Sequence, residues 1–231
     1  MSLADPCNRP FIDETLRLVR DALGARWVAF YGVDGDRNLR DFVVQGVPPG
    51  FHEDYLERME AFDPLHIRRI ARHAGPLVRW DDAAHYASPE HVSVYARFLL
   101  RYGVLDSLEL IFRDSSTIVA GLNVAWTERD PAPGATAIQL AAQLQRYIEF
   151  SLVERLRAAR SAWLDATRAF GLTSREREVV QLVCRGHTNQ GVAACLGIAE
   201  STVKTHLVRV FQKCSVDSRA GLVACLSDRH G

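Results

Sequence analysis

Residues 172–222 carry the pattern of four short amphipathic helices that follow one another closely. Serine or threonine stands where helices can begin, and glycine follows the first two, which are the usual start and stop signals of a helix. We expect a first helix from Thr173 or Ser174 to Gly186, a second from Thr188 to about Leu196, and a third from Glu200 or Ser201 to about Cys214. Gly197 gives a sharp turn between the second and third helices, so this pair is predicted to be a helix-turn-helix.

The third helix has an apolar face and a polar face. Val203, Leu207 and Val210 recur at helical spacing and can enter a small core. The polar face holds Thr202, Lys204, Thr205, His206 and Arg209. A helix fits the major groove of B-DNA, and cations and short hydrogen-bond donors suit phosphates and base edges. The alternative is the solvated face of an ordinary helical bundle.

This segment closely resembles the DNA-binding domain of the LuxR/FixJ family. The matching motifs are LT-x-RE-x-EV at 172–179, GHTN at 186–189, LGI at 196–198 and STVKTH at 201–206. The resemblance implies that double-stranded DNA is a partner and that Lys204 and Thr205 face its bases. The residues expected to contact or flank phosphates are Thr188, Asn189, Ser201, Thr202, Arg209 and Lys213. Val208 stands where some relatives have a cation and can contact a thymine methyl group instead.

The distribution of charge is uneven although the whole chain has a formal net charge of zero. Residues 171–231 hold eight basic and five acidic side chains, whereas residues 1–170 hold twenty basic and twenty-three acidic ones. The basic surplus therefore lies on the helix-turn-helix segment. It is modest for nucleic-acid binding, but two copies in a dimer double it.

Residues 1–160 predict a different architecture. β-Branched and aromatic runs at 26–33 and 39–46, and again at 107–113 and 117–126, are typical of two hairpins. Helical periodicity occurs at 10–24, 51–61, 65–73, 92–102 and 136–161. The expected fold is therefore α+β: an N-terminal α-β-α sandwich with an antiparallel sheet at 1–160, a linker at 161–171, and an all-α four-helix domain at 172–231.

Part of the N-terminal half resembles the acyl-homoserine-lactone-binding domain of quorum-sensing LuxR proteins, on FDPLHIRRIARHAGPLVRW followed by RYGVLDSLELIF. This resemblance implies a small-molecule sensor with Phe51, Tyr55, Asp63 and Trp80 at the ligand. Phe51 replaces a tryptophan whose indole N–H would donate to the lactone carbonyl, and phenylalanine has no donor. Asp63 can accept from an amide N–H. The expected cavity is lined further by Tyr31, Phe42, Phe98 and Tyr102.

The same residues have a purely structural interpretation. The Asp63-Pro64 step is also what a helix-initiating turn requires. Tyr55 and Trp80 are also what an aromatic core contains. Both interpretations stay open from the sequence alone.

The chain lacks the patterns of enzymes, metal proteins and membrane proteins. It has no glycine-rich phosphate loop, no nucleophile-elbow arrangement and no C-x-x-C pair, so we expect no catalytic residue, no cofactor and no metal. No apolar run reaches the roughly 18 residues of a membrane span, and no secretory signal begins the chain, so a cytoplasmic location is expected. The absence of lysine from residues 1–170 argues against a phosphoacceptor receiver domain.

These observations predict a dimeric, DNA-binding transcriptional regulator controlled by a small molecule at its N-terminal domain, with an N-acyl-homoserine lactone as a candidate. The alternative is a ligand-independent regulator whose N-terminal domain dimerises or binds a protein partner. An enzyme-like domain fused to a DNA-binding tail is a third interpretation. Apolar stripes at 138–156 and 222–226 are expected to join two copies, although the first stripe can also pack on its own sheet.

Overall fold

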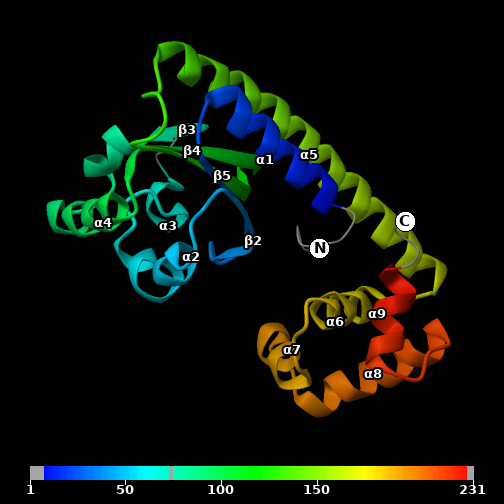
Figure 1. Cartoon of the computed structure of the whole chain (residues 1–231). Coiled ribbons are helices and arrows are strands. Elements are labelled where there is room, and N and C mark those ends of the chain that lie inside the picture. The colour runs from blue at the N-terminus through cyan, green and yellow to red at the C-terminus, as the bar shows by residue number, and fades with distance from the viewer. Residues whose placement is uncertain (1–7, 73–74, 228–231) are drawn as a thin grey trace. The chain divides into compact units, whose positions relative to one another are not determined.

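A computed structural model of the chain describes residues 8–72 and 75–227 (Figure 1). Contacts divide the chain into two compact units, one built from residues 3–153 and the other from residues 154–231. The outer ends of the two predicted domains, 1–7 and 228–231, and the end of the helix predicted at 65–73 lie outside the described residues. The α+β class is confirmed, since one unit holds an antiparallel sheet with helices and the other is helical.

The N-terminal unit is built on a five-stranded antiparallel sheet with the strand order β2-β1-β5-β4-β3. Its strands are β1 (Trp27–Val33), β2 (Leu39–Gln45), β3 (Leu77–Arg79), β4 (Val104–Asp114) and β5 (Thr117–Thr127). Both predicted hairpins are present, as β1 with β2 and β4 with β5. The pairing of β1 with β5 joins the two hairpins into the one antiparallel sheet that was predicted, although the sequence did not indicate which strands would pair there.

Helices α1 (Arg9–Leu23) and α5 (Ala135–Ala169) lie on one face of the sheet (Figure 1). The indole Nε1 of Trp126 in β5 donates to the carbonyl oxygen of Leu23 at 3.1 Å. The side-chain amide of Gln145 in α5 donates to the carbonyl oxygen of Ile111 in β4 at 2.7 Å. Because side chains alternate along a strand, every second residue points to the face of the sheet that α1 and α5 do not cover. Tyr31 and Glu109 belong to that second face.

The second face is covered by short helical segments: α2 (Phe51–Asp54), a π-helical turn η1 (Tyr55–Met59), η2 (Glu60–Phe62), α3 (Ile67–Ile70), η3 (Trp80–His85) and α4 (Pro89–Arg101). The single helix predicted at 51–61 is therefore three segments of different geometry. The helix predicted at 65–73 is wrong in extent, since α3 has only four residues. The Asp63 carboxylate accepts the backbone N–H of Leu65 at 2.9 Å and so forms a turn at residues 63–65. The helix therefore begins only after His66, whose side chain caps it.

The C-terminal unit contains the four predicted helices: α6 (Ser174–Cys184), α7 (Asn189–Leu196), α8 (Glu200–Cys214) and α9 (Arg219–Ser227). Thr173 caps α6 in a capping box, because its hydroxyl accepts from the N–H of Glu176 while the Glu176 carboxylate accepts from the N–H of Thr173. Thr188 caps α7 through its hydroxyl alone, which accepts from the N–H of Gly191. Gly197 ends α7 with φ of 62°, the left-handed conformation that favours glycine.

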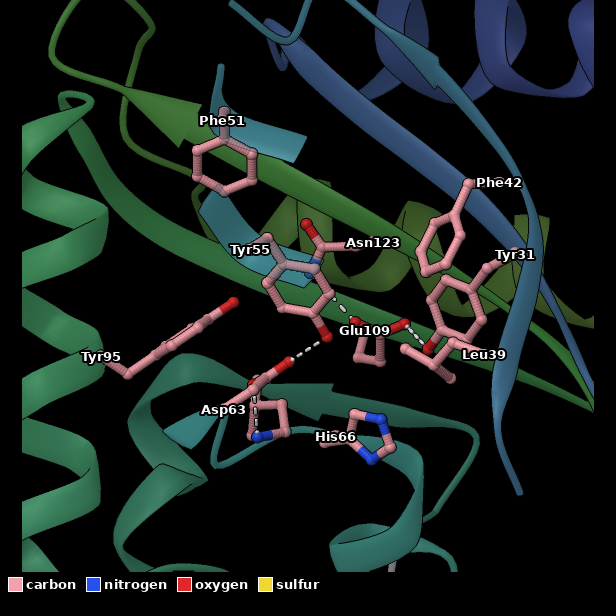
Figure 2. Close-up of a pocket in the computed structure, with 11 residues that line it drawn as sticks. Tyr31, Leu39, Phe42, Phe51, Tyr55, Asp63, His66, Tyr95, Glu109 and Asn123 are labelled. Atoms are coloured by element: carbon pink, nitrogen blue, oxygen red, sulfur yellow. Dashed lines mark hydrogen bonds between the residues drawn. The ribbon is translucent and has the colours of Figure 1, made fainter. Parts of the chain in front are cut away.

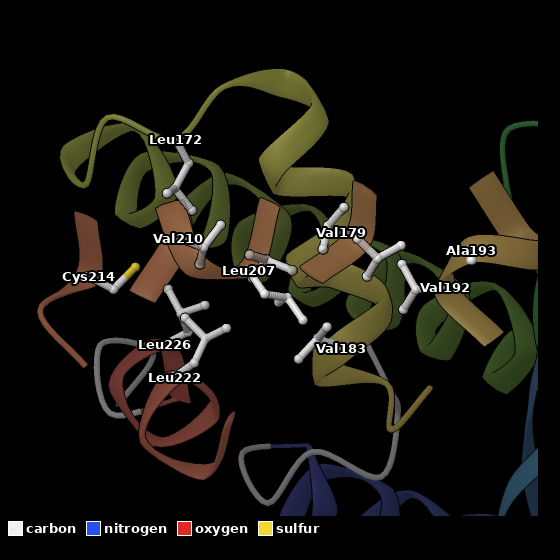
Figure 3. Packing of buried hydrophobic residues seen from close by; sticks show 12 residues of the cluster. Leu172, Val179, Val183, Val192, Ala193, Leu207, Val210, Cys214, Leu222 and Leu226 are labelled. Carbon is white, nitrogen blue, oxygen red and sulfur yellow. The ribbon is translucent and has the colours of Figure 1, made fainter. Parts of the chain in front are cut away.

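Valine and leucine side chains from all four helices, with Leu172 just before α6, form one core (Figure 3): Leu172, Val179, Val180, Val183, Val192, Val203, Leu207, Val210, Leu222 and Leu226. Leu222 and Leu226 are thus buried inside their own unit. The prediction that they offer a dimer stripe is wrong, because α9 needs its apolar face to close this core. In α5, Ile148 and Leu152 are also buried, at 2% and 1% exposure, so the inner part of the 138–156 stripe packs on its own unit.

Helix α5 continues to Ala169 and includes most of residues 161–171, where the linker was expected. Among the described residues, no helix combines the length and apolar character that a membrane crossing requires.

Candidate functional site

The exposed face of α8 carries most of the candidate DNA-binding residues. Val203 and Val210 are fully buried and fix the orientation of the helix. The exposed side chains of the helix include those of Ser201, Thr202, Lys204, Thr205, Val208 and Arg209. Val208 is 55% exposed one turn after Lys204, which leaves a methyl surface beside a cation. This face combines two cations, hydroxyl donors and one apolar patch, as base edges and phosphates require.

Lys204 is available for an external anion. Its ammonium lies 3.0 Å from the carboxylate of Glu200, one turn earlier, and its side chain is 63% exposed. Exposed pairs of this kind contribute little to stability, about 0–1 kcal/mol, so a phosphate or a guanine can replace the carboxylate at small cost. The turn before α8 is held from the other side, since Arg175 donates to the carbonyl of Leu196 at 3.0 Å.

Lys213 has a different environment from the other candidates. Its ammonium donates to Glu176 at 2.7 Å and to the carbonyl oxygen of Gly171 at 2.9 Å. Burial alone would raise the pKa of Glu176, but hydrogen bonds from Lys213 and Thr173 outweigh it and lower that pKa. Lys213 therefore ties the end of α8 to the start of α6, and any phosphate contact competes with this bond.

Thr188 and Asn189 lie at the start of α7. The hydroxyl of Thr188 accepts the N–H of Gly191 at 3.1 Å, so its oxygen already serves the cap. Asn189 is partly exposed at the first position of the helix. Exposed N–H groups and side chains at a helix start suit a phosphate.

The N-terminal unit contains a cavity of about 70 Å³ on the second face of the sheet (Figure 2). Its lining comes from β1, β2, β4 and β5 of the sheet and from the helical segments opposite: Tyr31, Leu39, Phe42, Phe51, Tyr55, Asp63, Leu65, His66, Tyr95, Glu109 and Asn123. Five of these eleven residues have phenyl or phenol rings and two have carboxyl groups. The combination of an apolar wall with a few polar groups is typical of small-molecule sites, although most such pockets are larger, at about 300–1,000 Å³.

Asp63 is held at the helical wall of the cavity. One carboxylate oxygen accepts the hydroxyl of Tyr55 at 3.0 Å and the other accepts the N–H of Leu65 at 2.9 Å. Burial raises the pKa of Asp63 to about 6, because an ionised carboxyl group loses its hydration there. The two hydrogen bonds counteract this effect only in part.

Glu109 lies across the cavity on the central strand β4. It accepts a hydrogen bond from the hydroxyl of Tyr31 and another from the amide of Asn123, the latter at 3.0 Å. Burial raises the pKa of Glu109 to about 8, and the nearby Asp63 adds to the rise. The ring of Tyr31 reaches Glu109 by lying over Gly121 on the neighbouring strand. A side chain at Gly121 would come closer than 3.0 Å to three atoms of Tyr31.

The structure brings three of the four predicted ligand residues together. Phe51, Tyr55 and Asp63 line the cavity, and so do Tyr31 and Phe42. Trp80 does not line it, because it packs behind Tyr95 with ring centroids 6.0 Å apart. Phe98 and Tyr102 are likewise displaced from the lining, and both rings contact Phe51 instead.

Sequence reasoning missed Tyr95, Glu109 and Asn123. The signal for Glu109 was present, since an acidic residue interrupts an otherwise apolar strand, SLELIF. Asn123 is its cross-strand partner, which only the pairing of β4 with β5 reveals. In the sequence Tyr95 is one more apolar position of a helix, and no neighbouring residue indicates that it lines a cavity.

Comparison with known proteins agrees with the C-terminal architecture. Residues 171–226 match the model of the family described as bacterial regulatory proteins, luxR family. The probable transcriptional regulatory protein NarL of Mycobacterium tuberculosis is 45% identical over 53 residues, which are 23% of this chain and 24% of that protein.

Two comparisons extend over both units. The Monoamine regulon transcriptional regulator of Klebsiella aerogenes is 27% identical over 222 residues, covering 94% of this chain and 90% of that protein. The crystal structure of Escherichia coli SdiA covers 100% of this chain and 92% of that one, with 17% identity and a TM-score of 0.47. The chain is thus a transcriptional regulator, and its residues 171–226 form a DNA-binding domain of the luxR family.

Proposed function

We propose that this regulator is controlled by a small molecule that binds in the cavity of the N-terminal unit. The observation that carries the proposal is the cavity itself, which places buried polar groups within an aromatic wall. Buried polar groups without full partners are costly, and they persist where a ligand completes them. In this proposal α8 contacts the DNA, and ligand binding in the N-terminal unit changes the affinity for DNA.

The identity of the ligand has two sources of support. The quorum-sensing resemblance favours an N-acyl-homoserine lactone, with Asp63 accepting its amide N–H and Tyr55 near its carbonyl. The relative from Klebsiella aerogenes, similar along nearly the whole chain, is named for a monoamine regulon. Amines therefore belong in the same ligand screen as lactones.

The alternative is a ligand-independent regulator whose N-terminal unit binds a protein partner. Leu100 and Leu105 favour it, since they are 60% and 59% exposed at the end of α4 and the start of β4. Mass spectrometry of gently purified protein separates the two functions. A small-molecule mass lost on denaturation supports the sensor, whereas a co-purifying protein lost when both leucines are replaced by serine supports the partner.

We also propose that the regulator acts as a homodimer in the cytoplasm. Each helix-turn-helix unit reads one half-site, so two copies are needed for tight binding. Tyr147 and Phe150 support this step, because they lie three residues apart on α5 and are 65% and 67% exposed. Light scattering at micromolar concentration should give a dimer mass, and replacing both residues by serine should give the monomer. A monomer mass for the unaltered chain, with and without DNA, would reject the dimer.

The control by ligand is tested by measuring DNA affinity. Fluorescence anisotropy with labelled operator DNA, selected from random sequences by the purified protein, gives the dissociation constant with and without each compound. A compound that raises the melting temperature should also change DNA affinity, since both effects follow from binding to one state. If no compound in a broad screen changes either quantity, control by a small molecule is rejected while DNA binding stands.

A further inference from the structure

The cavity contains two buried carboxyl groups that have no cationic partner among the described residues. Asp63 is 9% exposed and Glu109 is 4% exposed. Every hydrogen bond they accept comes from a neutral donor: Tyr55 and the backbone of Leu65 for Asp63, and Tyr31 and Asn123 for Glu109. Buried carboxylates usually pair with a cation, so this pair is incomplete.

The lining supplies no positive charge. It includes neither lysine nor arginine, and its one basic residue is His66. The Nδ1 of His66 accepts the N–H of Arg68 at 3.1 Å, which leaves the proton on Nε2, 3.0 Å from Glu60. Burial lowers the pKa of His66, so the ring is neutral. Arg69 acts on Asp63 only at longer range, because its guanidinium donates to the carbonyl of Ala61.

The hydroxyl of Tyr95 is a further polar group of the cavity lining that a ligand can reach. Tyr95 is 8% exposed, and its hydroxyl has no hydrogen-bond partner among the described residues. Figure 2 shows this hydroxyl pointing into the cavity, toward Tyr55 and Asp63. Its oxygen keeps accessible surface, unlike Arg40 Nε and His206 Nδ1, which are fully buried without a partner, so a ligand in the cavity can form a hydrogen bond with it.

We propose that the cavity binds a small organic cation, a protonated amine whose ammonium group lies between Asp63 and Glu109 and whose apolar part contacts the surrounding rings. An ammonium has three donors and no acceptor, which matches two carboxyl groups and a hydroxyl. Aromatic faces attract cations, and cages of aromatic rings with a carboxylate are a known way to bind them. This inference rests on the proposed function, in which the cavity is the sensor site.

The charge of the cavity favours one positive charge. Around neutral pH Asp63 is mainly ionised, because its pKa is about 6, while Glu109 mainly retains its proton, because its pKa is about 8. The cavity lining therefore has a charge close to −1, which a monovalent ammonium neutralises. A neutral lactone leaves this charge buried without a partner. Phe51 also lacks the donor that a lactone carbonyl would need.

The first measurement is isothermal titration calorimetry of the full-length protein with 2-phenylethylamine and butylamine. The matched neutral probe is 2-phenylethanol, which replaces the ammonium by a hydroxyl, and N-octanoyl-homoserine lactone tests the other ligand class. We expect an amine to bind and its neutral analogue to bind at least roughly tenfold more weakly, the loss typical of a charge-assisted hydrogen bond. If neither amine binds, or if the alcohol binds as tightly as the amine, the inference is wrong.

The second measurement assigns the site. Glu109→Gln and Asp63→Asn keep the shape of each side chain and remove its charge, and each should weaken amine binding by roughly 10- to 100-fold. Tyr95→Phe removes only the hydroxyl and covers the case in which a carboxyl variant fails to fold. Glu57→Gln is the control, because Glu57 is exposed on the same helical segment as Tyr55. Amine affinity that survives all three cavity substitutions places the amine elsewhere and overturns the inference.

The outcomes separate this inference from the proposed function. If the lactone binds and neither amine binds, the proposal of a ligand-controlled regulator stands, and the inference of a cationic ligand is wrong. If none of these four compounds binds, the cation is rejected, and control by a small molecule is rejected as well only if the broad screen also finds no ligand. Binding of an amine that also changes operator affinity supports both together.

Discussion

Replacing Glu109 by glutamine should remove a pH dependence from the stability of the N-terminal unit. The amide keeps the size of the carboxyl group and can still accept from Tyr31, but it cannot ionise. In the unaltered protein the folded pKa of Glu109 is about 8, well above its ordinary value of 4.5. The folded state therefore holds a proton that the unfolded chain has already released at neutral pH. By linkage, this group makes the free energy of unfolding fall as pH rises toward 8.

The size of the effect follows from the same values. One proton difference changes the free energy of unfolding by about 1.4 kcal/mol per pH unit. Asp63 contributes with the same sign, but its folded pKa is about 6, so most of its effect ends below pH 6.5. Between pH 6.5 and 7.5 the unaltered protein should thus lose about 1 kcal/mol relative to the glutamine variant. The tyrosines that face Glu109, Tyr31 and Tyr95, stay neutral there because burial raises their pKa further.

Urea denaturation followed by tryptophan fluorescence at several pH values measures this difference, since Trp27 and Trp126 are buried in the sheet unit. Glu57→Gln should follow the unaltered protein at every pH. Parallel curves for the unaltered protein and Glu109→Gln, or a stability that rises with pH only in the unaltered protein, would refute the argument that Glu109 is protonated in the fold.

Three further predictions concern single side chains. Lys204→Ala should weaken operator binding by about 1–3 kcal/mol and relax sequence preference if the lysine contacts a base, and a gel-shift series with unchanged preference would contradict this. Gly121→Ala should displace Tyr31 and destabilise the N-terminal unit by about 1–3 kcal/mol, so an unchanged melting temperature would show that the ring can move freely. Lys213→Met should leave Glu176 buried without its cation and destabilise the C-terminal unit by about 1–2 kcal/mol. Urea denaturation followed by helical circular dichroism measures the loss, which should shrink as pH falls through the lowered pKa of Glu176.

The C-terminal unit could be predicted from its sequence because its signals are local. Thr173 and Thr188 are caps, and Gly197 adopts the left-handed conformation that ends α7. Each of these features is readable within four residues of chain. What could not be read was the role of Lys213, because its partner Glu176 lies 37 residues away and meets it only in the folded core.

The N-terminal unit was harder to predict because its site depends on pairings between distant strands. Tyr31 and Glu109 are 78 residues apart, and Asn123 joins them only through the register of β4 with β5. Trp80 was predicted to contact the ligand because of the family resemblance, but in the structure it packs against Tyr95 and does not line the cavity. Sequence patterns located Asp63 and part of the aromatic wall of the cavity, but not the polar strand residues Glu109 and Asn123.

The two units differ in how consistently they obey local rules, and this difference supports the functional assignment. In the C-terminal unit the caps of α6 and α7, the turn at Gly197 and the apolar periodicity favour the same fold, and the exceptions are the uncapped start of α8 at Ala199 and the left-handed Ser215 at its end. In the N-terminal unit a buried strand carries an acid at Glu109, a second acid faces it at Asp63, and a π-helical turn begins at Tyr55. Burial of the two acids lowers the stability of the fold at neutral pH, and π-helical turns are frequent at functional sites. Features that cost stability and converge on one cavity are explained best by a ligand that compensates them when it binds.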